Sequence, residues 1–166
     1  QMFRNQRSAL GEKDSPRTAQ VYDQLGIALH NRGEYDPASK CLQAALKIWE
    51  KVQPKDNPDT ARTQDNLGIT MMFLNDLNAA GAHLERAMQM RKRSLGVDAP
   101  DLGASYLHIG ILQRTQGKLE EARASFDRAQ QIFAIAPAKS RALYSETLVE
   151  SGIVLQMLGR TDEAGG

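Results

Sequence analysis

The sequence predicts an all-α protein, a solenoid in which antiparallel helix pairs stack one after another. Two observations carry this prediction. First, residues of one type recur every 42 positions, and self-similarity at a fixed period is the signature of a repeat architecture. The clearest such column consists of Gly26, Gly68, Gly110 and Gly152. Second, only 5% of the residues are aromatic, while alanine is frequent and there are six methionines, and both of these residues favour helix.

The first helix of each pair, helix A, is predicted to begin at a proline. Pro16, Pro58 and Pro100 keep the same spacing. Proline suits the first position of a helix because its missing N–H has no partner there and its φ is already helical. Ser15 and Asn57, which precede two of these prolines, are good N-cap residues. Ala99 precedes the third proline and is a poor N-cap residue, so Asp98 is expected to compensate.

A tight turn is predicted between helix A and helix B of each pair. The residues at that point are Gly33, Asn75, Gly117 and Gly159. Asparagine is the residue that tolerates a left-handed backbone best after glycine, so its presence predicts a left-handed turn. Small residues in the columns of Gly26 and Ala38 let the two helices approach closely. In the first unit we predict helix A over about 16–31 and helix B over about 36–52, each with apolar residues at helical spacing.

The columns divide the chain into five segments. Residues 1–14 read as the tail of a preceding repeat and its linker. Three complete units follow at 15–56, 57–98 and 99–140, and an incomplete fourth unit occupies 141–166. Solenoid ends normally carry capping units, and neither end has one here, so we expect an internal fragment of a larger protein. We also expect self-association through the uncapped terminal repeats, which offer Ile153, Leu155, Met157 and Leu158.

Composition excludes several classes of protein. The 166 residues include 21 basic and 20 acidic ones, a net charge of +1, and no segment carries the one-sided basic stripe of a nucleic-acid binder. No apolar run approaches the roughly 20 residues that cross a membrane. The single cysteine, Cys41, allows no internal disulfide and is expected to be a buried structural thiol. A cytoplasmic protein is expected.

The repeat resembles a known family. The pattern Tyr22-x-x-Leu25-Gly26, Gly33-x-Tyr35, Ala38, Leu42 and Ala45-Leu46 is similar to the consensus of the tetratricopeptide repeat (TPR). The period and linkers such as 91–100 and 57–61 resemble the kinesin light chain subtype. The resemblance covers residues 15–164. It implies a right-handed superhelix whose A helices line a concave groove.

The resemblance also implies which residues line that groove. They are Gln20, Asp23, Ile27, His30 and Asn31 in the first unit; Arg62, Asp65, Ile69, Met72 and Phe73 in the second; Ala104, Leu107, Ile111, Arg114 and Thr115 in the third; and Glu146, Val149, Ile153, Gln156 and Met157 in the fourth.

Each part of this groove has two interpretations. The isoleucine column, to which Ile27 and Ile69 belong, is either an apolar floor for a peptide or packing between successive A helices. Asp23, Arg62 and Asp65 are either recognition residues, since packing has no evident need of charge there, or ordinary solvated charges. Binding of a chaperone's C-terminal carboxylate is not expected, because Asp23 and Ile27 stand where that clamp needs Lys and Asn. The kinesin light chain groove is often rich in Asn at the positions of Asp23, Asp65, Leu107 and Val149, and none of these residues is Asn here, so cargo recognition of that type is not expected either.

The remaining residues offer little chemistry. His30, His83 and His108 fall in separate units without the close spacing of a metal site, so no metal, cofactor or catalytic group is expected. Trp49 is expected to be partly exposed, as a contact residue or as a cover for the linker. The sequence therefore predicts a non-enzymatic scaffold that binds a protein or peptide in its groove. The alternatives are a regulatory or sensory module of a larger, even enzymatic, protein and a structural spacer or oligomerisation array.

Overall fold

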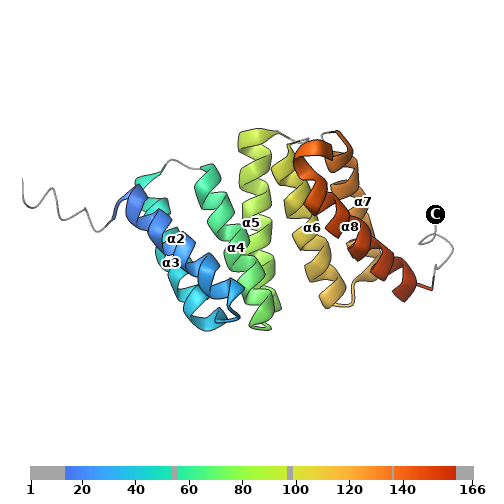
Figure 1. Cartoon of the computed structure of the whole chain (residues 1–166), viewed down its shortest axis with the longest axis horizontal. Coiled ribbons are helices and arrows are strands. Elements are labelled where there is room, and N and C mark those ends of the chain that lie inside the picture. Colours follow the sequence, from blue (N-terminus) through green and yellow to red (C-terminus); the bar gives the residue numbers. More distant parts are fainter. Residues whose placement is uncertain (1–13, 54–55, 97–98, 136, 160–166) are drawn as a thin grey trace, which may run out of the picture.

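The helices of the computed structural model follow one another along the long axis of the molecule, from α2 at one end to α8 at the other (Figure 1). The structure describes residues 14–53, 56–96, 99–135 and 137–159, and the side chains of 137–139 are not part of that description. The predicted tail of a preceding repeat, the start of the fourth helix B and the cap at Asp98 lie outside these residues.

Seven helices form within the described residues, and no strand forms among them. They are α2 (Pro16–Asn31), α3 (Tyr35–Val52), α4 (Pro58–Phe73), α5 (Leu77–Leu95), α6 (Pro100–Thr115), α7 (Leu119–Ile135) and α8 (Pro137–Met157). Each helix packs mainly against the helices before and after it in the chain. Each A helix also contacts the A helix of the next unit: α2 contacts α4, α4 contacts α6, and α6 contacts α8. The all-α array of consecutive antiparallel pairs is confirmed, and the bounds of α2 and α3 agree with the predicted helices A and B.

The predicted helix starts are present. Ser15 Oγ accepts a hydrogen bond from the Thr18 backbone N–H at 3.1 Å, and Asn57 Oδ1 accepts one from the Asp59 N–H at 2.8 Å. Ala99, which has no polar side chain, makes no such cap. Proline occupies the first turn of α2, α4 and α6. The capping residues therefore satisfy helix N–H groups that would otherwise lack a partner.

The turns between helices A and B have the predicted left-handed backbone. Gly33, Gly117 and Gly159 have φ of 79°, 77° and 73°, and Asn75 has φ of 61°. Because a side chain is strained at positive φ, glycine and asparagine are the residues that suit this position. The column of turn residues is thus explained by backbone geometry.

The small-residue columns bring the two helices of a pair into contact, as predicted. A Cβ atom placed on Gly26 would lie 2.7 Å from Leu42 Cγ and 3.3 Å from the Ala38 carbonyl oxygen. The same substitution at Gly68 would put a Cβ 2.7 Å from Leu84 Cγ. Helix B therefore fits against helix A only because these positions carry no side chain.

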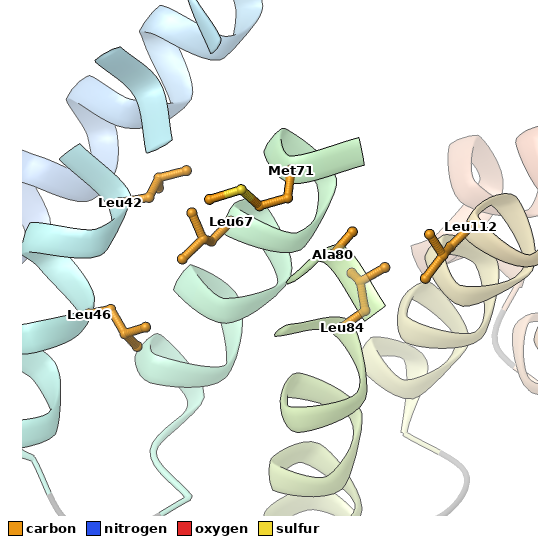
Figure 2. Packing of buried hydrophobic residues seen from close by; sticks show 7 residues of the cluster. All are labelled: Leu42, Leu46, Leu67, Met71, Ala80, Leu84 and Leu112. Carbon is orange, nitrogen blue, oxygen red and sulfur yellow. The ribbon is translucent and has the colours of Figure 1, made fainter. Parts of the chain in front are cut away.

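Much of the apolar core runs from one repeat into the next (Figure 2). One cluster joins helices of three successive units, α3, α4, α5 and α6. Its buried members are Leu42, Leu46, Leu67, Met71, Ala80, Leu84 and Leu112. Each helix pair thus buries its apolar face against its neighbour, which is how a solenoid obtains a continuous core.

Two expectations about single residues were wrong. Trp49 is fully buried, because the last turns of α3 pack on Ala19 at the start of α2. The later residues of its column, Arg91 and Phe133, are buried too, so this column belongs to the core. Cys41 is partly exposed rather than buried.

Candidate functional site

The predicted groove residues divide into three groups by exposure. The exposed ones are Gln20, Asn31, Phe73, Thr115, Glu146, Val149, Ile153, Gln156 and Met157. The half-buried ones are Ile27, His30, Arg62, Ile69, Met72, Ala104, Ile111 and Arg114. Asp23, Asp65 and Leu107 are buried, and Leu107 belongs to the core cluster around Phe126. Ligand contact is therefore open to the first two groups, while the third group lies inside the array.

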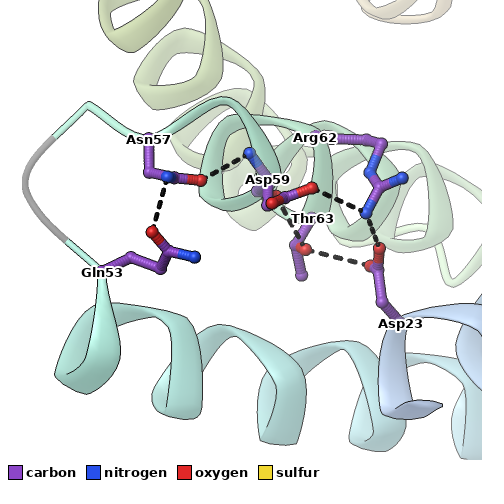
Figure 3. Close-up of polar contacts among 6 residues, drawn as sticks. All are labelled: Asp23, Gln53, Asn57, Asp59, Arg62 and Thr63. Carbon is purple, nitrogen blue, oxygen red and sulfur yellow. Dashed lines mark hydrogen bonds and ion pairs between the residues drawn. The ribbon is translucent and has the colours of Figure 1, made fainter. Parts of the chain in front are cut away.

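A buried carboxylate joins the first unit to the second (Figure 3). Asp23 Oδ2 on α2 lies 2.8 Å from Arg62 Nη2 on α4, and Thr63 Oγ1 donates to Asp23 Oδ1 at 3.0 Å. Arg62 also reaches Asp59 at 3.2 Å. Burial raises the pKa of Asp23, and the attraction of Arg62 and the Thr63 hydrogen bond offset this only in part.

A second buried carboxylate joins the second unit to the third. Asp65 Oδ2 on α4 lies 3.2 Å from Arg91 Nη2 on α5 and 3.1 Å from His108 Nδ1 on α6. Arg91 Nη1 also donates to Ser105 Oγ at 2.6 Å. Burial raises the pKa of Asp65, but His108 and Arg91 outweigh it, so the pKa lies below its usual value. Burial alone would lower the pKa of His108, and the facing Asp65 raises it above the usual value.

These ion pairs show that packing between repeats does use charge, so the expectation that it had no need of charge at Asp23 and Asp65 was wrong. The third and fourth units are joined in a related way, by Arg114 Nε and Glu150 Oε2 at 2.8 Å. Removing one partner of a buried pair leaves an unpaired buried charge, which is costly. The carboxylates of Asp23 and Asp65 are therefore positioned to hold successive units together.

A pocket of about 210 Å³ opens between α2 and α4. It is lined by Ile27, His30 and Asn31 of α2, Leu42 of α3, and Asn66, Ile69 and Thr70 of α4. Four of these residues, Ile27, His30, Asn31 and Ile69, are predicted groove residues. The structure thus brings together one part of the predicted groove, at the junction of the first two units.

An aromatic cluster lies beside this pocket. The rings of Tyr35 and Phe73 stack with centroids 4.8 Å apart, and the His30 ring meets the edge of each at 5.2 and 5.1 Å. Phe73 remains 57% exposed. The cluster therefore extends the apolar surface from the pocket across the end of the α2–α3 pair.

The hydrogen bonds of His30 fix its proton. Thr70 Oγ1 donates to the Asn66 carbonyl at 2.8 Å, and His30 Nδ1 lies 3.1 Å from the same hydroxyl oxygen. Because the hydroxyl has a single proton, Nδ1 of a neutral His30 is the donor in the second contact. Burial lowers the pKa of His30, which favours the neutral form of the imidazole.

Sequence reasoning missed three residues of this pocket, Leu42, Asn66 and Thr70. A signal was present for Thr70, which shares its column with Ala28, Leu112 and Val154. A polar residue in an otherwise apolar column marks a place where the packing differs. Asn66 and Leu42 carried no comparable signal, because their role depends on how α3 and α4 meet.

A larger hollow of about 520 Å³ opens between α3 and α5, among charged residues. Two ion pairs cross this hollow: Arg86–Glu50 at 3.0 Å between α5 and α3, and Arg93–Asp56 at 2.6 Å between α5 and the linker before α4. Within each pair the two side chains satisfy each other's charge. We therefore place the candidate site at the smaller pocket, where apolar walls and amide groups converge.

Within the part of the chain that the structure describes, no group of His, Cys, Asp and Glu side chains is arranged to hold a metal ion. The described helices also include none with the length and apolar character needed to cross a membrane.

The fold defines a helical-repeat protein built from consecutive antiparallel helix pairs. The model of the tetratricopeptide repeat matches residues 17–93 and 59–135. The chain therefore belongs to the tetratricopeptide repeat family. No curated protein sequence matches it.

Solved structures similar to this chain include kinesin light chain-like repeat proteins. BtubC (BKLC) from P. vanneervenii is 21% identical with a TM-score of 0.80, over 90% of this chain and 60% of BtubC. A second similar structure is that of the TPR-like repeats of a Podospora anserina kinesin light chain, repeats that are nearly identical to one another. It shares 18% sequence identity with this chain, with a TM-score of 0.79, and the match covers 91% of this chain and 72% of the Podospora chain. These likenesses concern the fold, and the chain spans 60% of the length of BtubC.

A third similar structure contains a peptide. The Rap conjugation gene regulator of plasmid pLS20, solved with the Phr* peptide, is 17% identical with a TM-score of 0.74. The match covers 96% of this chain and 42% of the regulator.

Proposed function

We propose that the chain is a scaffold that binds a peptide, or an extended segment of a partner protein, along its A helices. One observation carries the proposal. Four predicted groove residues, contributed by α2 and α4, converge on the pocket between the first two units. Pockets with apolar walls and a few polar groups are the usual form of a binding site.

Two further facts support this proposal. The tetratricopeptide repeat is typically a non-catalytic module for protein and peptide binding, and the similar Rap regulator was solved with a peptide. The surface beside the pocket is also suited to a peptide, because Asn31 and Phe73 are exposed next to half-buried Ile27 and Ile69. A carboxylate-clamp mode is not supported, since Asp23 is buried and already paired with Arg62.

The test is a selection of displayed random 12-residue peptides on the immobilised chain. Bound peptides are then synthesised and their affinities measured by fluorescence anisotropy. The double variant Asn31→Arg, Phe73→Arg alters two exposed groove residues and is expected to lose binding. The matched control, Gln43→Arg, changes an exposed residue of α3 and is expected to bind normally. Equal binding by both variants would contradict the proposed surface.

A second candidate function is a regulatory module within a larger protein. The observation that favours it is coverage, because the chain matches only 42% of the Rap regulator and 60% of BtubC. The sequence of the complete gene tests it, since the candidate requires a further domain whose activity changes when the repeats bind a peptide.

Association between copies through α8 is also a proposal. The support for it is an exposed apolar set on that helix, Leu148, Val149, Ile153 and Met157. Leu155 and Leu158, which were also expected to be available, are half-buried. Light scattering tests it, and a constant monomer mass at all concentrations would contradict it.

A further inference from the structure

We propose that the pocket between α2 and α4 takes a single large apolar side chain of the bound peptide and so sets the specificity of the groove. This inference rests on the proposed peptide-binding function, and it commits to the part of the peptide that is recognised. Three features of the pocket support it: its size, the chemistry of its lining and its place in the repeat.

The size of the pocket suits one side chain. Pockets for whole small-molecule ligands or cofactors commonly measure about 300–1,000 Å³. The volume here is about 210 Å³, below that range. A residue projecting from a peptide backbone fits such a space, whereas a cofactor does not.

The lining selects an uncharged, apolar group. Ile27, Leu42 and Ile69 are hydrophobic, and none of the seven lining residues is acidic or basic apart from His30, whose lowered pKa favours its neutral form. A charged side chain entering this pocket would lose its hydration without gaining a counter-ion, which is unfavourable. The carboxamides of Asn31 and Asn66 offer both donors and acceptors to the peptide backbone near the inserted side chain.

At the pocket the second unit departs from its own repeat. Thr70 occupies the column that holds Leu112 in the third unit and Val154 in the fourth. Leu112 is buried in the cluster with Leu84, and Val154 is buried against α7 and α6. Thr70 is fully buried too, but its side chain is shorter, its hydroxyl is hydrogen-bonded, and it lines the pocket between α2 and α4.

The substitution Thr70→Leu therefore closes the pocket with the residue that the chain itself uses in the next unit. The experiment selects displayed random 12-residue peptides on the wild-type chain and measures the affinity of the best peptide for three proteins. We expect the selected peptides to share one leucine, isoleucine, methionine or phenylalanine at a fixed position. Thr70→Leu is expected to weaken binding about 10- to 100-fold, the contribution of one buried apolar side chain. Gln43→Leu, which places a leucine at an exposed position of α3 outside the predicted groove, is the control and is expected to bind as the wild type does.

A second measurement leaves the protein unchanged. The shared apolar residue of the peptide is replaced by alanine, and the wild-type chain should then bind about 10- to 100-fold more weakly. Thr70→Leu should bind the original and the alanine peptide equally, because its pocket is filled.

The outcomes separate the two claims. Recovery of no binding peptide contradicts the proposed function, and this inference with it. Recovery of peptides without a shared apolar residue, or unchanged affinity after the alanine exchange in the peptide, overturns this inference and leaves the proposed function standing. If circular dichroism shows that Thr70→Leu does not fold, the affinity of the alanine peptide for the wild-type chain alone tests this inference.

Discussion

Arg91 Nη2 lies 3.2 Å from Asp65 Oδ2, and both side chains are less than 10% exposed. In the next unit the same two positions are occupied by Phe133 and Leu107, which are fully buried. One place in the repeat is thus filled by a buried ion pair in one unit and by an apolar pair in the next. The relationship makes the energetic value of the ion pair directly testable within the chain's own repeat.

Replacing one partner should destabilise the protein far more than replacing both. Arg91→Phe removes the guanidinium and leaves Asp65 buried with His108 as its remaining charged contact, and we expect a loss of about 3–5 kcal/mol in the free energy of unfolding. The double variant Asp65→Leu, Arg91→Phe places the third unit's residues at these two positions and should recover about 2 kcal/mol or more of that loss. Urea denaturation measures both.

The control for this prediction is Arg86→Ala, which breaks an exposed ion pair with Glu50 and should cost about 0–1 kcal/mol. The single variant Asp65→Leu is measured as well. If the losses in unfolding free energy of Asp65→Leu and Arg91→Phe simply added up in the double variant, the account would be contradicted, because Asp65 and Arg91 would then act independently.

The stability contribution of His108 should fall as pH rises. Asp65 and Glu146 raise its pKa above 6.5 in the folded state, while burial and Arg91 oppose this. The contribution is therefore fully present below about pH 6.5, the unfolded value, and is lost as pH rises through the folded pKa. The difference in unfolding free energy between the wild type and His108→Asn should be larger at about pH 5.5 than at about pH 8.5.

His83 is the opposite case and serves as the control. Burial lowers its pKa, so folding disfavours its protonation. The wild type should lose stability relative to His83→Gln as pH falls through about 6.5, the reverse of the slope at His108. If the difference in unfolding free energy between wild type and variant changed with pH in the same direction for His108→Asn and His83→Gln, the Asp65–His108 contact would not hold the histidine in its charged form.

The sequence predicted the fold in detail because the repeat constrains the backbone. A proline, a glycine or asparagine at the turn, and a small residue recur in each complete unit, and each has one physical role wherever it stands. Trp49 shows the limit of this reasoning. A large aromatic residue in a column with Arg91 looks exposed from the sequence, since arginine is seldom buried. Trp49 is buried by its packing on Ala19, and Arg91 is buried because it pairs with Asp65; only the assembled helices show these contacts.

The glycine column gives a matched pair of substitutions. A Cβ at Gly68 would lie 2.7 Å from Leu84 Cγ and 3.2 Å from the Ala80 carbonyl oxygen, whereas none of the described atoms lies within 4 Å of a Cβ at Gly152. Gly68→Ala should therefore destabilise the fold by about 1–3 kcal/mol. Gly152→Ala should be neutral or stabilise it by up to about 1 kcal/mol, because alanine favours helix. Thermal unfolding compares them, and equal losses would contradict the close approach of α4 and α5.

The turn residue Asn75 should tolerate glycine but not alanine. Its φ is 61°, a value that costs an ordinary side chain about 1–2 kcal/mol. We expect Asn75→Ala to lower the free energy of unfolding by about 1 kcal/mol and Asn75→Gly to leave it within about 0.5 kcal/mol of the wild type. A loss with glycine as large as that with alanine would mean that the asparagine side chain, and not the backbone, is what the turn requires.

The candidate site was less predictable than the fold. The A-helix positions of Ile27, His30, Asn31 and Ile69 follow from the repeat, and they do meet at one pocket. The charged positions Asp23 and Asp65 follow from the same register, yet they are turned into ion pairs by partners on other helices, Arg62 and Arg91. A single repeat column cannot show such partners. Arg91 lies 26 residues after Asp65 (91 − 65), Arg62 lies 39 residues after Asp23 (62 − 23), and the two arginines stand at different positions of the repeat.

The most direct test of the peptide-binding account is methyl NMR of the isoleucine-labelled chain during titration with a selected peptide. Ile27 and Ile69 line the pocket, whereas Ile48 and Ile132 are buried on the B helices α3 and α7. We predict saturable shifts of the Ile27 and Ile69 methyl signals, with those of Ile48 and Ile132 nearly unchanged. Saturable binding that shifts Ile48 or Ile132 and leaves Ile27 and Ile69 in place would contradict the assignment of the A-helix surface as the binding site.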